Sequence, residues 1–422
     1  MDKETNTLRN DEDVLLRVEH LCQYFKVGHG KYTKAVDDVS FDIKKGEVFG
    51  LVGESGCGKT TTGRSIIKIY DITSGSIYFK GTRICAGTGS YLNAIKQAKA
   101  ETASEIAKIR KSGDPSAAER IAALKAGLKK TVAENRAEIE KARFDHKKSD
   151  KVYAESLVKK CDEKYKALIA AASDEEEKKK LGKEWRSERR IASKTRLITK
   201  IQMIFQDPIA SLNPRMTVRE IISEGMVING IRDKEYIDEK VYGILNTVGL
   251  VPEHAGRYPH EFSGGQRQRI GIARSVVMEP DLIIADEPVS ALDVSIQAQV
   301  INLLNDLRRQ MGLTIMFIAH DLSVVKYFSD RIGVMYYGKM VELAEADELF
   351  AHPMHPYTRS LLSAIPLPDP HYEKNHRRIT YNPLKDHDYS SSKPTMREIG
   401  NGHFVLCDDA EEKKYRAEFG ID

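Results

Sequence analysis

The chain lacks any apolar run long enough to cross a membrane as a helix. A spanning helix needs roughly 18 consecutive apolar residues, and no stretch approaches that length. Residues 1–12 are polar and contain no apolar h-region, which predicts that no signal peptide is present. If this protein works at a membrane, we therefore expect a partner to hold it there.

Cysteine is also scarce. The 422 residues contain five cysteines, which are scattered and form no C-x-x-C pair. This usage is typical of a reducing compartment and argues against a disulfide framework or a zinc site. The formal net charge of +4 is too small to indicate nucleic-acid binding. Residues 87–199 nevertheless carry about 28 basic against about 18 acidic side chains, so one segment holds the basic excess.

Outside that segment, short apolar strand patterns alternate with amphipathic helical patterns. This alternation predicts an α/β fold with a largely parallel sheet whose faces are covered by helices. We expect residues 13–85 and 200–345 to form this domain, residues 1–12 to be a disordered lead, and residues 346–422 to be a peripheral C-terminal extension.

Residues 86–199 have a different composition, dominated by alanine, lysine and glutamate. Apolar residues recur there at spacings of three, four and seven, as at Ile121, Leu124 and Leu128, which predicts long amphipathic helices. The segment leaves and re-enters a folded domain, so an antiparallel helical hairpin fits it. The turn is expected near His146–Asp150, or near Ser112–Ser116 if the arms are unequal.

The sequence GESGCGKT follows an apolar strand and precedes a helix. Its glycines allow the backbone to bend around an anion, and its N–H groups with the helix N-terminus favour phosphate. Lys59 is expected to reach the β- and γ-phosphates, and the Thr60 hydroxyl to ligate Mg²⁺. The expected nucleotide-binding residues are Gly53, Glu54, Ser55, Gly56, Cys57, Gly58, Lys59, Thr60 and Thr61.

Two adjacent acids end the buried strand in LIIADEP. A strand-terminal charge pair with no catalytic role is the simpler interpretation. Beside a nucleotide loop, however, Asp286 is expected to hold Mg²⁺ through its hydration shell, and Glu287 to polarise the attacking water. Phosphoryl transfer needs a placed water, a metal and fixed charge rather than covalent chemistry.

FSGGQ opens another helix, whose N-terminus is a second anion site. One ATP does not require two such sites in one chain. We therefore expect this motif to contact the γ-phosphate of an ATP that is held by a second, similar domain. Dimerisation of two such domains is then part of the mechanism. The residues concerned are Ser263, Gly264, Gly265 and Gln266, with Asp293 at the dimer seam.

Four further side chains follow strands. Gln206 is either a polar strand end or a sensor of Mg²⁺ and water, and His320 is either structural or a γ-phosphate contact. Tyr24 or Phe25 is expected to stack on adenine, with Phe25 preferred, although adjacent aromatics are often core residues.

Together these motifs resemble the ATP-binding cassette (ABC) family, with a Walker A loop (GESGCGKT), Q-loop (Gln206), signature (FSGGQ), Walker B strand (LIIADEP), D-loop (SALD) and switch histidine (His320). The segments MIFQDPIASLNPRMTV and HPYTRSLLSAIPLPDP are similar to the F-type ATPase subunits of oligopeptide and dipeptide importers. The resemblance implies a RecA-like core with an antiparallel β subdomain and a helical subdomain. Glu287, His320 and Gln206 are then the catalytic residues, and Thr60, Gln206 and Asp286 serve Mg²⁺.

The same resemblance implies ATP and Mg²⁺ as ligands and a place on the cytoplasmic face of the cell membrane. The implied partners are a second, D-type ABC ATPase subunit, two membrane permeases and an extracytoplasmic peptide-binding protein, with no nucleic acid. Two features depart from the family. Residues 86–199 are additional to the usual pattern, and the tail holds only Cys407, so no iron–sulfur cluster is expected.

Several alternatives stay open. The helical segment is a solvated hairpin, a protein-docking arm, a surface for anionic lipid headgroups or, against its interleaved acids, a nucleic-acid contact. The cargo is a peptide, or nickel or a glycoside within the same family. A soluble mechanochemical ABC ATPase and an exporter ATPase are the other functions considered. A translation-factor cassette protein normally carries two tandem cassettes, whereas this chain has one set of motifs.

Overall fold

A computed structural model describes residues 13–28, 30–112, 116–172, 174–290, 292–365, 379–390 and 392–420. The expected disordered lead therefore lies outside the described residues. The chain divides into two compact units. The first contains residues 1–15, 42–67 and 199–422, and the second contains residues 16–41 and 68–198.

The first unit is built on an eight-stranded sheet with the order β11-β12-β10-β9-β3-β8-β7-β6. The run from β9 to β6 is parallel, whereas β10, β12 and β11 are added antiparallel at one edge. Every residue of β3, β7 and β8 is buried, as is typical of strands covered on both faces. The strands are β3 (Val48–Val52), β6 (Ile201–Ile204), β7 (Leu282–Asp286), β8 (Thr314–Ala319), β9 (Arg331–Tyr336), β10 (Lys339–Glu345), β11 (Thr395–Gly400) and β12 (His403–Cys407).

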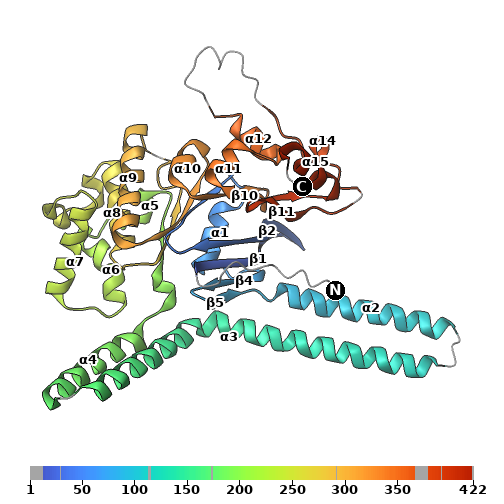
Figure 1. The fold of residues 1–422 in the computed structure, drawn as a ribbon, viewed down its shortest axis with the longest axis horizontal. Coiled ribbons are helices and arrows are strands. Elements are labelled where there is room, and N and C mark those ends of the chain that lie inside the picture. Colours follow the sequence, from blue (N-terminus) through green and yellow to red (C-terminus); the bar gives the residue numbers. More distant parts are fainter. Residues whose placement is uncertain are drawn as a thin grey trace, which may run out of the picture. The chain divides into compact units, whose positions relative to one another are not determined.

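Helices and short 3₁₀ turns complete the first unit (Figure 1). Local capping sets several of their starts: Thr217 and Glu220 form a capping box at α6, and Asp233 caps α7. The elements are α1 (Lys59–Ile66), η2 (Leu197–Lys200, at the boundary of the units), α5 (Pro208–Ser211), α6 (Val218–Ile228), α7 (Lys234–Thr247), η3 (Pro252–Gly256), η4 (Pro259–Glu261), α8 (Gly264–Val276), α9 (Val294–Met311), α10 (Leu322–Phe328), α11 (Ala346–Ala351), α12 (Pro356–Leu362), α14 (Pro383–Asp386) and α15 (Asp409–Phe419). The expected α/β architecture with a helical subdomain is confirmed.

The C-terminal tail is less peripheral than the sequence suggests. Strands β11 and β12 extend the main sheet, and alternate residues of β12 are buried, namely His403, Val405 and Cys407. Val405 and Cys407 pack with Ile399 and Tyr415 in a small core of their own. The alternation of buried and less buried residues in HFVLC explains why this segment pairs as a strand.

The second unit contains a four-stranded sheet with the order β2-β1-β4-β5. Strand β4 pairs antiparallel with both β1 and β5, as expected for an antiparallel β subdomain. The strands are β1 (Val14–Gly28), β2 (Lys31–Lys44), β4 (Ser74–Phe79) and β5 (Thr82–Ala86), and the first residues of β1 and the last of β2 belong to the first unit.

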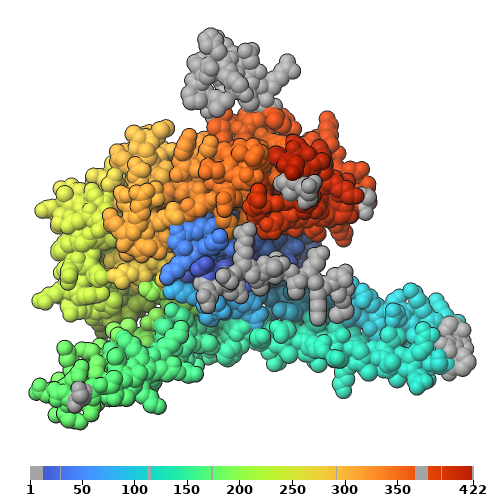
Figure 2. Space-filling model, viewed as in Figure 1, coloured from blue at the N-terminus to red at the C-terminus, as the bar shows by residue number. Residues whose placement is uncertain are grey.

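The charged segment of the second unit folds as three helices, α2 (Gly89–Ser112), α3 (Ala117–Ala171) and α4 (Glu175–Lys194). The 55-residue α3 packs against α2 over one half and against α4 over the other (Figure 1), and Figure 2 shows α2 and α3 in contact along their length. Where a hairpin of two helical arms was expected, the described residues form three helices, and α3 packs against both α2 and α4. Of the two expected turns, His146–Asp150 is helical, and residues 113–115 of the other, Ser112–Ser116, lie outside the described residues.

The reason for the continuous helix is that the middle of α3 is docked on the β sheet. Arg83 Nε of β5 donates to Asp145 Oδ2 at 2.7 Å, Nη2 lies 2.6 Å from the same oxygen as an ion pair, and both side chains are largely shielded from solvent. Lys68 Nζ donates to the His146 carbonyl at 2.6 Å, and His146 Nε2 lies 3.1 Å from Asp71. Tertiary contacts thus hold as helix a stretch that the sequence offered as a turn.

We expect Asp145→Asn to weaken this docking, because it removes the charge that pairs with the partly buried Arg83 guanidinium. Loss of such a pair costs about 1–3 kcal/mol. Hydrogen exchange of the α3 amides around residue 145 should accelerate accordingly. Asp162→Asn is the matched control, since Asp162 lies on the same helix, α3, and pairs with Arg189 of α4 at a more exposed place. Equal amide exchange rates around residue 145 in both variants would contradict the role of the Arg83–Asp145 pair in docking α3.

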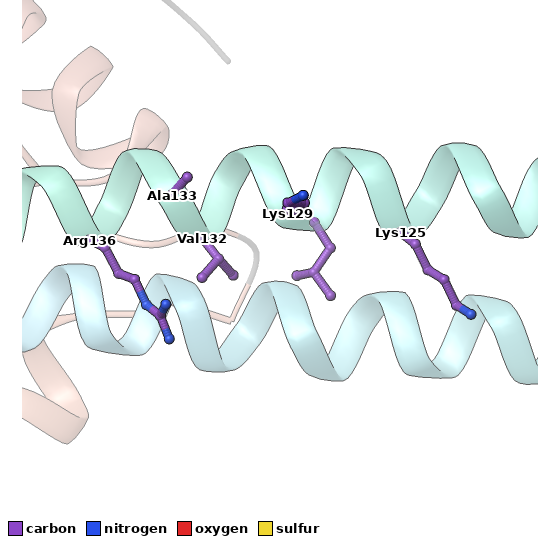
Figure 3. Close-up of a pocket in the computed structure, with 6 residues that line it drawn as sticks. Lys125, Lys129, Val132, Ala133 and Arg136 are labelled. Carbon is purple, nitrogen blue, oxygen red and sulfur yellow. The ribbon is translucent and has the colours of Figure 1, made fainter.

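The arm formed by α2 and α3 carries a shallow groove of about 390 Å³. Leu128 and Val132 provide its apolar side chains, and three cations surround them (Figure 3). The lining residues are Lys125, Leu128, Lys129, Val132, Ala133 and Arg136. None of the candidate nucleotide residues belongs to this groove, and most of them lie in the first unit.

Candidate functional site

Four neighbouring parallel strands of the first unit deliver the candidate residues to one edge of the sheet. Strand β3 leads into the glycine-rich loop, β7 ends at Asp286, and β8 ends one residue before His320. Strand β6 ends two residues before Gln206. The four lie in the order β3-β8-β7-β6, so their carboxyl ends share the edge where ligands bind in open α/β sheets.

The glycine-rich loop uses backbone conformations that side chains disfavour. Gly53, Gly56 and Gly58 have φ values of 148°, 81° and 107°. Gly58 is the N-cap of α1, which begins at Lys59. The Lys59 ammonium is buried within the loop, where Nζ donates to the carbonyls of Gly53 at 2.7 Å and Glu54 at 3.0 Å. The loop therefore holds its own cation at the start of the helix.

Thr60 and Asp286 meet beside this loop. The Thr60 hydroxyl donates to Asp286 Oδ1 at 2.7 Å. Asp286 is fully buried, and its Oδ2 has no hydrogen-bond partner among the described residues. Burial raises the pKa of this carboxyl, although the Thr60 bond opposes the rise. A buried carboxylate oxygen without a partner, next to a hydroxyl, fits a divalent cation such as Mg²⁺.

Glu287 is held by two side chains that arrive from different strands. Gln206 Nε2 donates to Glu287 Oε2 at 3.0 Å, and His320 Nδ1 lies 3.2 Å from the same oxygen. Glu287 has a φ of 44°, which is unusual for a residue with a side chain, and its N–H donates to the Ile318 carbonyl at 2.9 Å. The structure thus brings together the three residues expected to be catalytic, around one carboxylate oxygen.

The signature residues lie at the start of α8. Ser263 forms a capping box with Gln266, and Gly264 and Gly265 open the helix. A side chain at position 265 would place its Cβ 2.6 Å from Ile296 of α9, so glycine permits this packing. Asp293 is the N-cap of α9 but makes no capping hydrogen bond through its side chain. Their expected contacts with a second cassette stay predictions.

The aromatic pair belongs to the second unit. The Tyr24 hydroxyl donates to the Asp37 carboxylate, so its polar end is engaged. The Phe25 ring packs edge-on against Tyr70, with 5.2 Å between the ring centroids. Stacking of either ring on adenine stays a prediction.

Sequence reasoning missed one residue of this site, Tyr357 of α12. Its hydroxyl oxygen accepts the Glu54 backbone N–H at 3.0 Å, within the glycine-rich loop. The segment HPYT that contains it was the available signal, but nothing in a linear sequence indicates that position 357 meets position 54.

Comparison with protein families agrees with this geometry. A model described as "ABC transporter" matches residues 36–166 and 165–290. The chain belongs to the ABC transporter family. It is therefore an ATP-binding subunit with ATPase activity. A second model, described as "Oligopeptide/dipeptide transporter, C-terminal region", matches residues 341–393 of this ABC ATPase.

Curated relatives align with nearly the whole ABC ATPase chain. The oligopeptide transport ATP-binding protein OppF of Bacillus subtilis is 45% identical, with 95% of this chain and 98% of that protein covered. OppF of Streptococcus mutans is 42% identical, with 95% and 97% covered. The solved structure of cbiO1 from Clostridium perfringens aligns at 21% identity and a TM-score of 0.49, covering 81% of this chain and 92% of that one. Within the described residues, every helix is too short or too polar to cross a membrane.

Proposed function

We propose that this ABC ATPase powers the import of oligopeptides or dipeptides through a membrane transporter. The observation that carries the proposal is the match of residues 341–393 to the C-terminal region of oligopeptide and dipeptide transporters. The names of the relatives, oligopeptide transport ATP-binding proteins at 45% and 42% identity, support the same cargo class.

Glu287 is proposed as the general base of hydrolysis. Gln206 and His320 both engage Oε2, which orients the carboxylate and leaves Oε1 to accept a proton. As the water oxygen bonds to the γ-phosphorus, its proton passes to Glu287. The bond from that phosphorus to the β–γ bridging oxygen breaks, and its electron pair stays on ADP. Such positioning of water and charge is the main source of catalysis in phosphoryl transfer.

Thr60 and Asp286 are proposed to hold Mg²⁺, with Gln206 nearby. When bound with ATP, Mg²⁺ neutralises charge that develops on the phosphates. Lys59 is proposed to reach the β- and γ-phosphates from its place against the loop carbonyls. The remaining nucleotide contacts are assigned to the N–H groups of residues 53–61, and adenine stacking to Phe25 or Tyr24.

The complete site is proposed to form between two cassettes. Ser263, Gly264, Gly265 and Gln266 at the start of α8 would contact the γ-phosphate of the opposite cassette, and Asp293 would lie at the seam. An exposed helix N-terminus suits an anion, which supports this assignment. The dimer of cassettes would close when ATP binds and reopen after hydrolysis. This movement would then drive the conformational change of the transporter.

Coupling to the membrane is proposed to run through the Q-loop. Ile209, three residues after Gln206, is 62% exposed, and Ile228 at the end of α6 is 71% exposed. Exposed apolar side chains suit contact with a permease helix. The partners would be a second, D-type ATPase, two permeases and an extracytoplasmic binding protein, with this chain on the cytoplasmic face of the membrane. Residues 13–85 and 200–345 would be the nucleotide-binding domain, and residues 86–199 an insertion in it.

The test is a mild-detergent purification of the tagged full chain from native membranes, followed by mass spectrometry and a peptide-uptake assay in cells lacking the chromosomal copy. We expect two permeases, a second cassette ATPase and a lipid-anchored binding protein to copurify, and uptake to depend on the chain. Glu287→Gln is the matched control, because it should assemble without restoring uptake. Copurification of a nickel- or glycoside-binding protein would assign that cargo to the transporter in place of peptides. A complex without permeases would contradict the proposed import function.

A further inference from the structure

A side chain from the C-terminal region contacts the Walker A loop directly. Tyr357 of α12 is 2% exposed, and burial raises the pKa of its hydroxyl, which therefore stays protonated. Its oxygen accepts the Glu54 N–H at 3.0 Å. This places a phenol about 300 residues away in sequence on the second residue of the phosphate-binding loop.

The bond acts on a peptide group that Lys59 holds at its other end. The Gly53 carbonyl and the Glu54 N–H belong to one planar peptide. Lys59 Nζ donates to that carbonyl at 2.7 Å, while Tyr357 accepts that N–H. Gly53 has a φ of 148°, and glycine leaves several orientations of the peptide open. Because glycine permits several orientations, the hydrogen bonds to Lys59 and Tyr357 select one orientation of the peptide plane.

Tyr357 is itself held rigidly. Its N–H donates to His355 Nδ1 at 3.1 Å. The buried Glu342 carboxylate accepts the N–H groups of Met354 at 2.7 Å and His355 at 3.1 Å, and pairs with the buried His403 at 2.8 Å. The Tyr357 ring also packs against Tyr336 and Tyr381, with centroids 4.4 and 5.5 Å apart. A hydroxyl supported in this way keeps the loop peptide in one orientation.

We propose that Tyr357 is a positioning residue for nucleotide binding. It fixes the peptide between Gly53 and Glu54 and so presets both the loop and the Lys59 ammonium for phosphate. This inference rests on the assignment of Lys59 to the phosphates but is independent of the transported cargo. It gives the C-terminal region of this ABC ATPase a direct influence on its affinity for ATP.

Tyr357→Phe tests the proposal, because it removes the hydroxyl and keeps the ring. We expect the Kd for MgATP, measured by calorimetry on the full chain, to rise roughly three- to tenfold, as for the loss of one hydrogen bond. The KM for ATP should rise by a similar factor, with kcat little changed. Tyr381→Phe is the matched control, since its ring packs on Tyr357 from the tail, and its Kd should equal that of the wild type.

A double-mutant comparison separates positioning from a general loss of structure. Circular dichroism establishes that each variant is folded. Adding Tyr357→Phe to Lys59→Met should change the Kd far less than it does in the wild type, because the effect passes through Lys59. An unchanged Kd in Tyr357→Phe, or equal losses in both backgrounds, would overturn the inference. Failure of Lys59→Met to weaken MgATP binding would instead overturn the phosphate assignment.

Discussion

Replacing Glu287 with glutamine is expected to lower the rate of ATP hydrolysis by roughly 10²–10⁴-fold, the usual contribution of a general base. The amide is isosteric and keeps an oxygen that can accept the Gln206 bond now made to Oε2. The glutamine amide cannot take the proton of the attacking water. ATP binding and the orientation of the side chain should therefore persist while hydrolysis is slowed. Together with its partner ATPase, the variant should therefore accumulate as an ATP-bound dimer, visible by size-exclusion chromatography of the copurified pair in MgATP.

Glu253→Gln provides the matched control, because Glu253 is an exposed acid of the same unit that lies outside the site. It should hydrolyse ATP and dimerise as the wild type does. Turnover of Glu287→Gln within about threefold of the wild type would remove Glu287 from the role of base, since even weak base catalysis exceeds that factor.

Gly53→Ala is expected to destroy nucleotide binding and to destabilise the first unit. The added Cβ would lie 2.2 Å from the Met335 carbonyl oxygen and 2.8 Å from Cys57 Sγ. Backbone, rather than a flexible side-chain end, blocks the position, and the φ of 148° is one that alanine disfavours. The free energy of unfolding should fall by more than about 3 kcal/mol, as is typical of severe packing defects. Urea denaturation and MgATP calorimetry measure the two effects.

Gly56→Ala is the informative comparison. Gly56 also has a positive φ, 81°, but within the described part of the chain no atom beyond its two chain neighbours lies within 4 Å of its added Cβ. Its cost to stability should be limited to the left-handed conformation, about 1–2 kcal/mol. If the two alanine variants unfold at the same urea concentration, the close approach of Met335 to the loop does not control its shape.

Much of the candidate site was predictable because its motifs follow strands. Glu287 and His320 each come directly after an apolar strand pattern, Lys59 follows the glycine-rich loop at the end of another, and parallel strands bring such positions to one edge. The strand and helix patterns of the α/β unit likewise match the elements observed, since long apolar runs and capped amphipathic helices are local signals.

The charged helices and the tail were predicted less well. The periodicity of residues 86–199 indicated helices but did not place their turns, because the long α3 continues through His146 only where it docks on β5. The tail appeared peripheral, because five-residue strands such as β12 become evident only when a sheet edge is available to pair with them.

The α/β class, the phosphate-binding loop, the adjacent acids and the ABC family could all be inferred from the linear chain, because each depends on residues that are neighbours in the chain or follow a strand. The folded chain was needed to show that Gln206 and His320 share one oxygen of Glu287, that Arg83 pairs with Asp145, and that Tyr357 bonds to the loop. Such contacts join residues tens to hundreds of positions apart. Folding selects them by burial and hydrogen bonding, which local sequence does not encode.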